Sequence, residues 1–179
     1  MVEYINNQTT LPRKGSIMFE FMRGTNETMK KSLNKFKLMN KYFLVPLYRA
    51  NILPLFLIGR KVVLLYTKGR KSGKTRITPV EYRRYNEKVL LFSSRGKKGD
   101  WYRNIKGNPE SFKIKIGLKT YKPKISETTL DEKIEILEWY VEKFPGTAKE
   151  LFGYNKEDKV TKELLYPIAD FLEILQLEI

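Results

Sequence analysis

A basic turn bracketed by two glycines constrains the fold of this chain more than any other stretch. The turn, Gly69 to Gly73, follows an aliphatic run from Val62 to Tyr66 and precedes a segment in which apolar and charged residues alternate. Aliphatic and β-branched runs, and alternation with a period of two residues, are typical of β-strands. The sequence therefore predicts a β-hairpin with the basic turn at its tip.

The residue types in this turn favour an anionic ligand. Glycines allow backbone angles that other residues avoid, so amide N–H groups near Gly69 and Gly73 can face a ligand. Cationic and hydroxyl side chains accompany them: Arg70, Lys71, Ser72, Lys74, Thr75 and Arg76. Such donors suit a phosphate or a carboxylate. A solvated hairpin tip without a ligand is the alternative that the charges alone leave open.

The end of the turn is similar to a nucleotide-binding P-loop, but two features exclude that motif. Too few residues separate Gly69 from Gly73. In addition, Pro79 and the alternation after it predict a strand where a P-loop is followed by a helix.

Further motifs follow the turn. They are Phe92-Ser93-Ser94-Arg95 at the end of an expected strand, Trp101-Tyr102-Arg103-Asn104 in an expected short helix, and Asn108-Pro109. In this order and approximate spacing, they and the basic turn resemble the deazaflavin-dependent nitroreductase family, whose members use coenzyme F420. The resemblance covers roughly Val45 to Ile125. It implies the α+β class, with a small antiparallel split β-barrel, an N-terminal amphipathic helix and C-terminal helices.

The resemblance also implies an activity. It indicates an oxidoreductase of the nitroreductase or quinone reductase type, which transfers a hydride from reduced coenzyme F420 to an electron-poor acceptor. A quinone, a nitro compound or an enone would serve as the acceptor. An FMN-dependent split-barrel reductase is the alternative within the same fold.

Candidate site residues are taken from the positions that match the family's motifs. The basic hairpin would contact the phosphate and glutamate tail of the coenzyme, and the other motifs would lie beside its ring. These positions are Arg70, Lys71, Ser72, Arg76, Ile77, Thr78, Pro79, Phe92, Ser93, Ser94, Arg95, Trp101, Tyr102 and Asn104. Core packing is the alternative role of Trp101, and a buried amide that bonds a turn is the alternative role of Asn104. Tyr140 and Tyr154 are the candidates for a catalytic, substrate-side tyrosine.

One loop departs from the family's pattern. Residues Gly96 to Gly99 form a shorter loop than in many relatives, and the proline usually found near the tryptophan is absent. The ring pocket is therefore expected to differ at this loop.

Composition narrows the classes of function. The chain has no Cys and no His, which excludes thiol nucleophiles, Ser-His-Asp triads, disulfides and the usual zinc sites. An enzyme of this composition is expected to rely on a cofactor, and no metal is expected. The formal net charge of +15 favours an anionic partner. A basic barrel that binds nucleic acid is the alternative of another class, but no nucleic-acid motif is present and no specific nucleic acid is expected.

The chain is expected to form one domain of three parts. Residues 1–60 are predicted to form an irregular arm, Met1 to Gly24, followed by an amphipathic helix from Glu27 that includes Leu47. Residues 61–126 are expected to form a barrel core of five or six short strands. Residues 127–179 are expected to form helices.

Sequence signals also place the C-terminal helices. A capping box at Thr129 to Glu132 begins the first of them. The last helix is expected to carry Leu172 and Leu175 on its apolar face, with Pro167 in its first turn.

The lysine-rich N-terminal helix leaves two interpretations open. Its apolar stripe either packs on the barrel or enters the surface of an anionic membrane. No transmembrane helix is predicted, because prolines and charged residues interrupt the apolar stretch 44–58. The protein is expected to be cytoplasmic, with peripheral membrane contact as the second interpretation. It is expected to be a monomer or a homodimer that takes a small-molecule acceptor.

Overall fold

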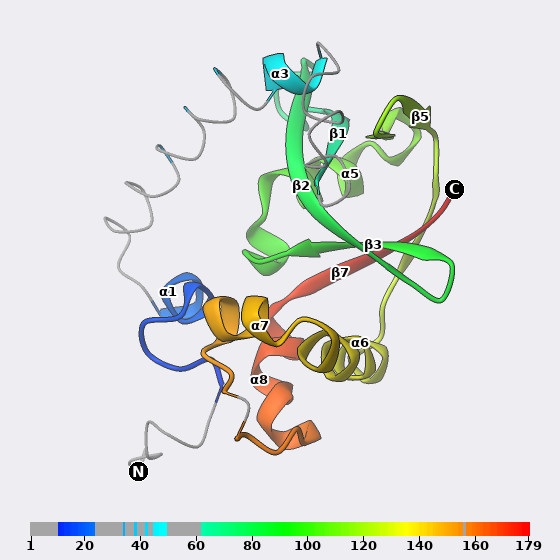
Figure 1. Ribbon diagram of the computed structural model, residues 1–179. Helices are drawn as coiled ribbons and strands as arrows, with labels where there is room; N and C mark the ends of the chain where they lie inside the picture. Colours follow the sequence, from blue (N-terminus) through cyan, green and yellow to red (C-terminus); the bar gives the residue numbers. More distant parts are fainter. Residues whose placement is uncertain are drawn as a thin grey trace.

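The computed structural model describes residues 11–23, 34, 38, 42, 45–49, 62–155 and 157–179. Their strands form one seven-stranded antiparallel sheet, which curls between two groups of helices (Figure 1). In spatial order the strands are β5 (Lys119–Tyr121), β4 (Lys113–Ile116), β1 (Val62–Lys68), β2 (Thr75–Tyr85), β3 (Lys88–Ser93), β7 (Glu173–Glu178) and β6 (Lys124–Glu127). The predicted α+β split barrel is confirmed, with more strands than the expected five or six.

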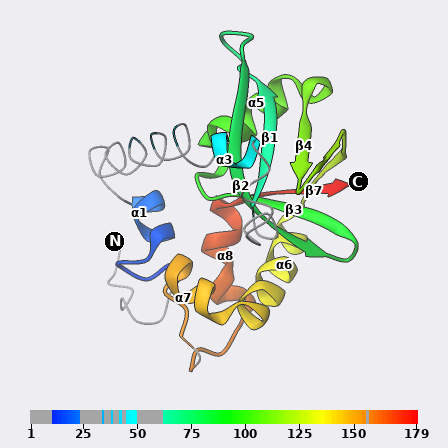
Figure 2. The ribbon, with the colours of Figure 1, turned by 45° about the horizontal axis from the view of Figure 1, so that its top comes forward.

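Four helices gather at one end of the sheet. They are α1 (Ile17–Arg23), α6 (Leu130–Lys143), α7 (Pro145–Phe152) and α8 (Lys162–Phe171). At the other end lie α3 (Val45–Arg49) and α5 (Asp100–Gly107), beside β1 and β2 (Figures 1 and 2). The short 3-10 turns η3 (Gly96–Lys98) and η4 (Pro109–Ser111) flank α5.

Strand β2 joins the two halves of the sheet. Its first part, Thr75 to Glu81, pairs with β1, and its second part, Tyr82 to Tyr85, pairs with β3. The predicted hairpin is therefore confirmed, with Lys68 opposite Thr75 at its tip. The chain reverses after Tyr85, as the dipeptide Asn86-Glu87 predicts, and both of these residues have positive φ.

Strands β3 and β7 are buried on both faces because each separates two apolar cores. Leu90 and Ile174 belong to the core formed with the four helices at one end. Leu91 and Leu175 belong to the core inside the barrel, which also includes residues of β1 and α5. These strands form the shared wall between the helices and the barrel.

The predicted last helix is wrong beyond Phe171. Helix α8 ends there, and the following residues form β7, which pairs with β3 and β6. A short strand buried on both faces shows no alternation, so its apolar residues fit the end of a helix equally well. Pro167 lies inside α8, whereas Thr161 caps the helix by accepting a hydrogen bond from the Leu164 N–H.

The N-terminal predictions have a mixed outcome. The expected irregular arm is wrong at Ile17–Arg23, where α1 packs Met18 into the helical core. Ser16 favours that helix by accepting a hydrogen bond from the Phe19 N–H. Most of the predicted amphipathic helix from Glu27 lies outside the described residues, and Leu47 belongs to α3.

Other local signals are confirmed or slightly displaced. The Thr129 capping box is present in full at the start of α6. The short helix expected around Trp101 is present as α5; a cap at Asp100 was also predicted, but Gly99 takes the N-cap position and Asp100 is the first helical residue. None of the helices in the described part of the chain combines the length and the apolar character that a membrane crossing requires.

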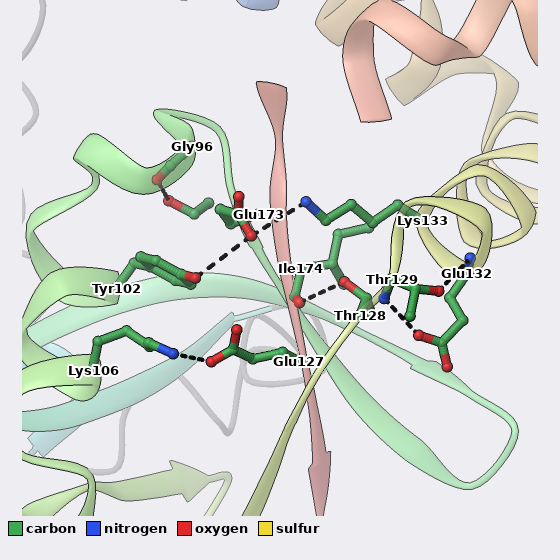
Figure 3. A network of polar contacts seen from close by, with 11 residues as sticks. Gly96, Tyr102, Lys106, Glu127, Thr128, Thr129, Glu132, Lys133, Glu173 and Ile174 are labelled. Carbon is green, nitrogen blue, oxygen red and sulfur yellow. Dashed lines mark hydrogen bonds and ion pairs between the residues drawn. The ribbon is translucent and has the colours of Figure 1, made fainter. Parts of the chain in front are cut away.

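A buried ion pair connects the helical end to the barrel. Lys133 of α6 lies 3.2 Å from a carboxylate oxygen of Glu173, and both side chains are about nine-tenths buried. The Tyr102 hydroxyl of α5 donates to the same carboxylate at 3.5 Å (Figure 3). Burial, together with the carboxylates of Glu173 and Glu127, raises the pKa of Tyr102 to about 12. One carboxylate therefore binds α5, α6 and β7 to one another.

This geometry predicts a large cost for removing the carboxylate. Glu173→Gln leaves the buried Lys133 ammonium without its charge partner, so we expect the free energy of unfolding to fall by about 3 kcal/mol. The matched control is Glu178→Gln on the same strand, where Glu178 is 48% exposed and pairs with an exposed lysine. That change should cost less than about 1 kcal/mol. Equal losses in urea denaturation of the two variants would contradict the role of the buried pair.

Candidate functional site

A cavity of about 1060 Å³ lies beside the basic turn. This volume is slightly above the roughly 300–1,000 Å³ range of ligand sites. Its walls come from the hairpin tip, the start of β2, the end of β3 with the loop after it, the first turns of α5, and α3. The lining residues are Val45, Pro46, Gly69, Arg70, Lys71, Ser72, Thr75, Arg76, Ile77, Thr78, Pro79, Ser93, Ser94, Arg95, Gly99, Asp100, Trp101 and Asn104.

The basic turn is closed by its own backbone. The Gly69 N–H donates to the Lys74 carbonyl at 2.9 Å, and the Gly73 N–H donates to the Gly69 carbonyl at 2.7 Å. Gly73 has a φ of +63°, which glycine adopts without strain. The turn is therefore a compact loop that presents its charged side chains at the edge of the cavity.

Asn104 of α5 fixes the position of this turn. Its side-chain oxygen accepts a hydrogen bond from the Arg70 N–H at 3.1 Å, and Asn104 itself is buried. The buried amide that bonds a turn, stated above as the alternative role of Asn104, is thus present in the structure. Asn104 also lines the cavity, so the structural role does not remove it from the candidate site.

The cavity wall carries more positive than negative charge. Four cationic residues line it, Arg70, Lys71, Arg76 and Arg95, whereas Asp100 is the one acidic residue among the described lining. A guanidinium nitrogen of Arg70 lies 3.7 Å from the Asp100 carboxylate, and one of Arg95 lies 3.4 Å from it. The site therefore offers several cationic hydrogen-bond donors to one multiply charged anion.

Close packing shapes the wall after β3. The buried Ser93 hydroxyl donates to the Gly96 carbonyl at 2.8 Å, which holds the turn η3 against the strand end. Gly96 has a φ of +54°, and a Cβ there would collide with the Phe171 carbonyl. A Cβ at Gly99 would collide with the Ser93 hydroxyl. Both glycines therefore allow the backbone approaches that form this wall.

Another part of the cavity is apolar. Val45 and Pro46 of α3 line it together with Ile77, Pro79 and Trp101. Val45 packs against the cluster around Leu64 on β1, to which Ile77 also belongs. The cavity thus combines a cationic region with apolar surface, which suits a ligand that has a charged tail and a flat apolar ring.

The structure brings twelve of the fourteen predicted cofactor residues together in this cavity. The two that do not line it are Phe92, whose ring packs 5.4 Å from that of Tyr140, and Tyr102, which is directed to Glu173. Asp100, Gly99, Val45 and Pro46 line the cavity without having been predicted. Asp100 and Gly99 directly precede Trp101 in the sequence, at one and two positions, and this proximity was the available signal. No sequence pattern connects α3 to the turn.

The two tyrosine candidates lie outside this lining. Tyr140 is buried in the helical core among aromatic rings, including that of Phe152. Burial and the carboxylate of Glu81 raise the pKa of Tyr140 to about 12, although Arg83 opposes the shift. Tyr154 is buried too, and its hydroxyl donates to the Asp158 carbonyl at 3.2 Å. The structure thus places both tyrosines in the packing of the helices.

Known proteins are similar to this chain over the region that contains most of the cavity lining. A family model described as F420H(2)-dependent quinone reductase matches residues 51–157. Among solved structures, the chain is similar to an F420-H2 dependent reductase at 24% identity, over 66% of this chain and 95% of that one, with a TM-score of 0.43. It is also similar to a putative 5-nitroimidazole antibiotic resistance protein from Bacteroides thetaiotaomicron, at 11% identity, 69% and 76% coverage, and a TM-score of 0.45.

The packing at Gly99 gives a prediction about the cavity wall. Gly99→Ala should lower the free energy of unfolding by about 1–3 kcal/mol, because its Cβ collides with the Ser93 hydroxyl. In a Ser93→Ala background the same change should be much less destabilising, because the colliding atom is gone. Denaturation of the two single variants and the double variant measures this coupling. If the two losses of unfolding free energy are additive, the collision with the Ser93 hydroxyl is not the cause of the destabilisation.

Proposed function

The chain belongs to the F420H(2)-dependent quinone reductase family, and from this premise we propose that the cavity beside the basic turn holds coenzyme F420. The family makes the protein an oxidoreductase that uses this coenzyme, and it confirms the resemblance on which the sequence interpretation depended. The observation that carries the proposal is the convergence of twelve motif residues on one cavity.

The donor set of the cavity fits the coenzyme. Its tail carries a phosphate and glutamate carboxylates, which match Arg70, Lys71, Arg76 and the hydroxyl of Ser72. Its ring system is flat and largely apolar, which matches the surface of Trp101 and Ile77. We infer that the basic turn holds the tail and that the end of β3 and α5 hold the ring.

When bound, the reduced coenzyme supplies a hydride to an electron-poor acceptor. The residues of this chain bind and orient the two reactants, and the apolar wall of Val45, Pro46 and Trp101 limits the access of water. No tyrosine, serine–base pair or thiol is found among the described lining residues. Solvent or a tyrosine would supply the proton that accompanies the hydride, and no side chain is required as a nucleophile.

The acceptor and the setting of the reaction are also proposals. We propose a small quinone, nitro compound or enone as the acceptor, in a cytoplasmic protein that is a monomer or a homodimer. Contact of the N-terminal segment with an anionic membrane stays a prediction, since most of the residues that suggested it lie outside the described part of the chain.

The choice between coenzyme F420 and FMN can be tested by titration. We expect the purified protein to bind coenzyme F420 at least about tenfold more tightly than FMN, because several cations face a tail with several charges. The reduced coenzyme should also be oxidised when a quinone is added. Tight binding of FMN, with no binding of coenzyme F420 at tens of micromolar, would favour the FMN-dependent alternative.

A double variant tests the role of the basic turn. Arg70→Ala with Lys71→Ala should weaken binding of the coenzyme by about tenfold or more, and more strongly for a tail with more glutamates. The control is Lys113→Ala with Lys119→Ala, which removes the same charge from exposed positions on β4 and β5. If the two double variants bind the coenzyme with the same affinity and the same salt dependence, the turn is a solvated hairpin tip.

A further inference from the structure

The carboxylate of Asp100 faces two arginines of the cavity, and one of them, Arg70, lies in the turn assigned to the coenzyme tail. Arg70 comes from the hairpin tip and Arg95 from the loop after β3, and their guanidinium groups lie 3.7 and 3.4 Å from the Asp100 carboxylate. All three residues line the cavity. In a site that otherwise attracts anions, this negative charge requires an explanation.

Positioning of the arginine backbones does not explain it. The backbone of Arg70 is already held by Asn104 through its N–H. The backbone of Arg95 is held by the turn η3, in which the Lys98 N–H donates to the Arg95 carbonyl at 3.1 Å. The backbone of both residues therefore keeps its place without the carboxylate.

The ion pairs are also loose. Both distances exceed the roughly 2.7–2.9 Å of a charge-assisted hydrogen bond, and the Asp100 side chain is 59% exposed. Exposed pairs of this kind contribute little to stability, so an incoming anion can replace the carboxylate. Asp100 occupies the first turn of α5, where the helix dipole stabilises its negative charge independently of the arginines.

We propose that Asp100 lowers the affinity for the coenzyme by competing with its anionic tail for Arg70 of the basic turn. This inference rests on the function proposed above. Without the carboxylate, a wall of four cations would hold a polyanion strongly and release it slowly. With it, tail binding has to displace an anion that is already present. The oxidised coenzyme therefore leaves more readily after each hydride transfer, and a fresh reduced molecule enters.

The test compares two single charge removals. Asp100→Asn keeps the size of the side chain and removes the competing charge. Glu110→Gln is the matched control, because its side chain is 91% exposed, lies outside the cavity lining and pairs with Lys122. Equilibrium binding and displacement kinetics are measured with oxidised coenzyme F420 and with its deazaflavin riboside, which lacks the phosphate and the glutamates.

The expected result is a gain of affinity confined to the tail. Asp100→Asn should lower the Kd of the coenzyme about threefold to tenfold, mainly through slower dissociation. The gain should shrink as salt is raised, because exposed charges are screened. The riboside should bind both proteins equally, and Glu110→Gln should behave like the unchanged protein.

Each of the other outcomes overturns the inference in a different way. Equal or weaker coenzyme binding by Asp100→Asn would show that the carboxylate orients the arginines or takes no part, and the proposed function would stand. An equal gain for the riboside would show that Asp100 acts on the ring. If the unchanged protein binds neither the coenzyme nor the riboside, the proposed function fails together with the inference.

Discussion

The architecture depends on the burial of β3 and β7 on both faces. One face of each strand contributes to the helical core, through Leu90 and Ile174, and the other contributes to the barrel core, through Leu91 and Leu175. Neither core is closed without these two strands. The buried carboxylate of Glu173, at the start of β7, adds a polar connection between the two sides by binding Lys133 and Tyr102 (Figure 3). The packing of β3 on both faces therefore fixes the position of the loop that follows it, and this loop forms one wall of the cavity.

The cavity itself depends on contacts between segments that are distant in the chain. Asn104 holds the hairpin tip through the Arg70 N–H, and Ser93 holds the turn η3 through the Gly96 carbonyl. These are hydrogen bonds to backbone atoms, so they fix the course of the chain and leave the charged side chains available to a ligand.

Local signals in the sequence predicted much of this fold. The hairpin around the basic turn, the capping box at Thr129 and the short helix with Trp101 each depend on neighbouring residues, and the structure contains all three. The strand β7 was missed because burial on both faces removes the alternation that marks a strand. Val45 and Pro46 were missed in the cavity wall because their place depends on the packing of α3 against β1 and β2, which no local pattern encodes.

The pairing of β3 with β7 has a consequence for synthesis of the protein. Val89 pairs with Leu177, so β3 leaves the ribosome long before its partner exists. Contacts between residues so far apart in the sequence form slowly, because closing the long intervening chain costs conformational entropy. Until then β3 carries an apolar surface on both faces and an unpaired edge. That edge leaves β3 open to pairing with other chains until β7 has been made.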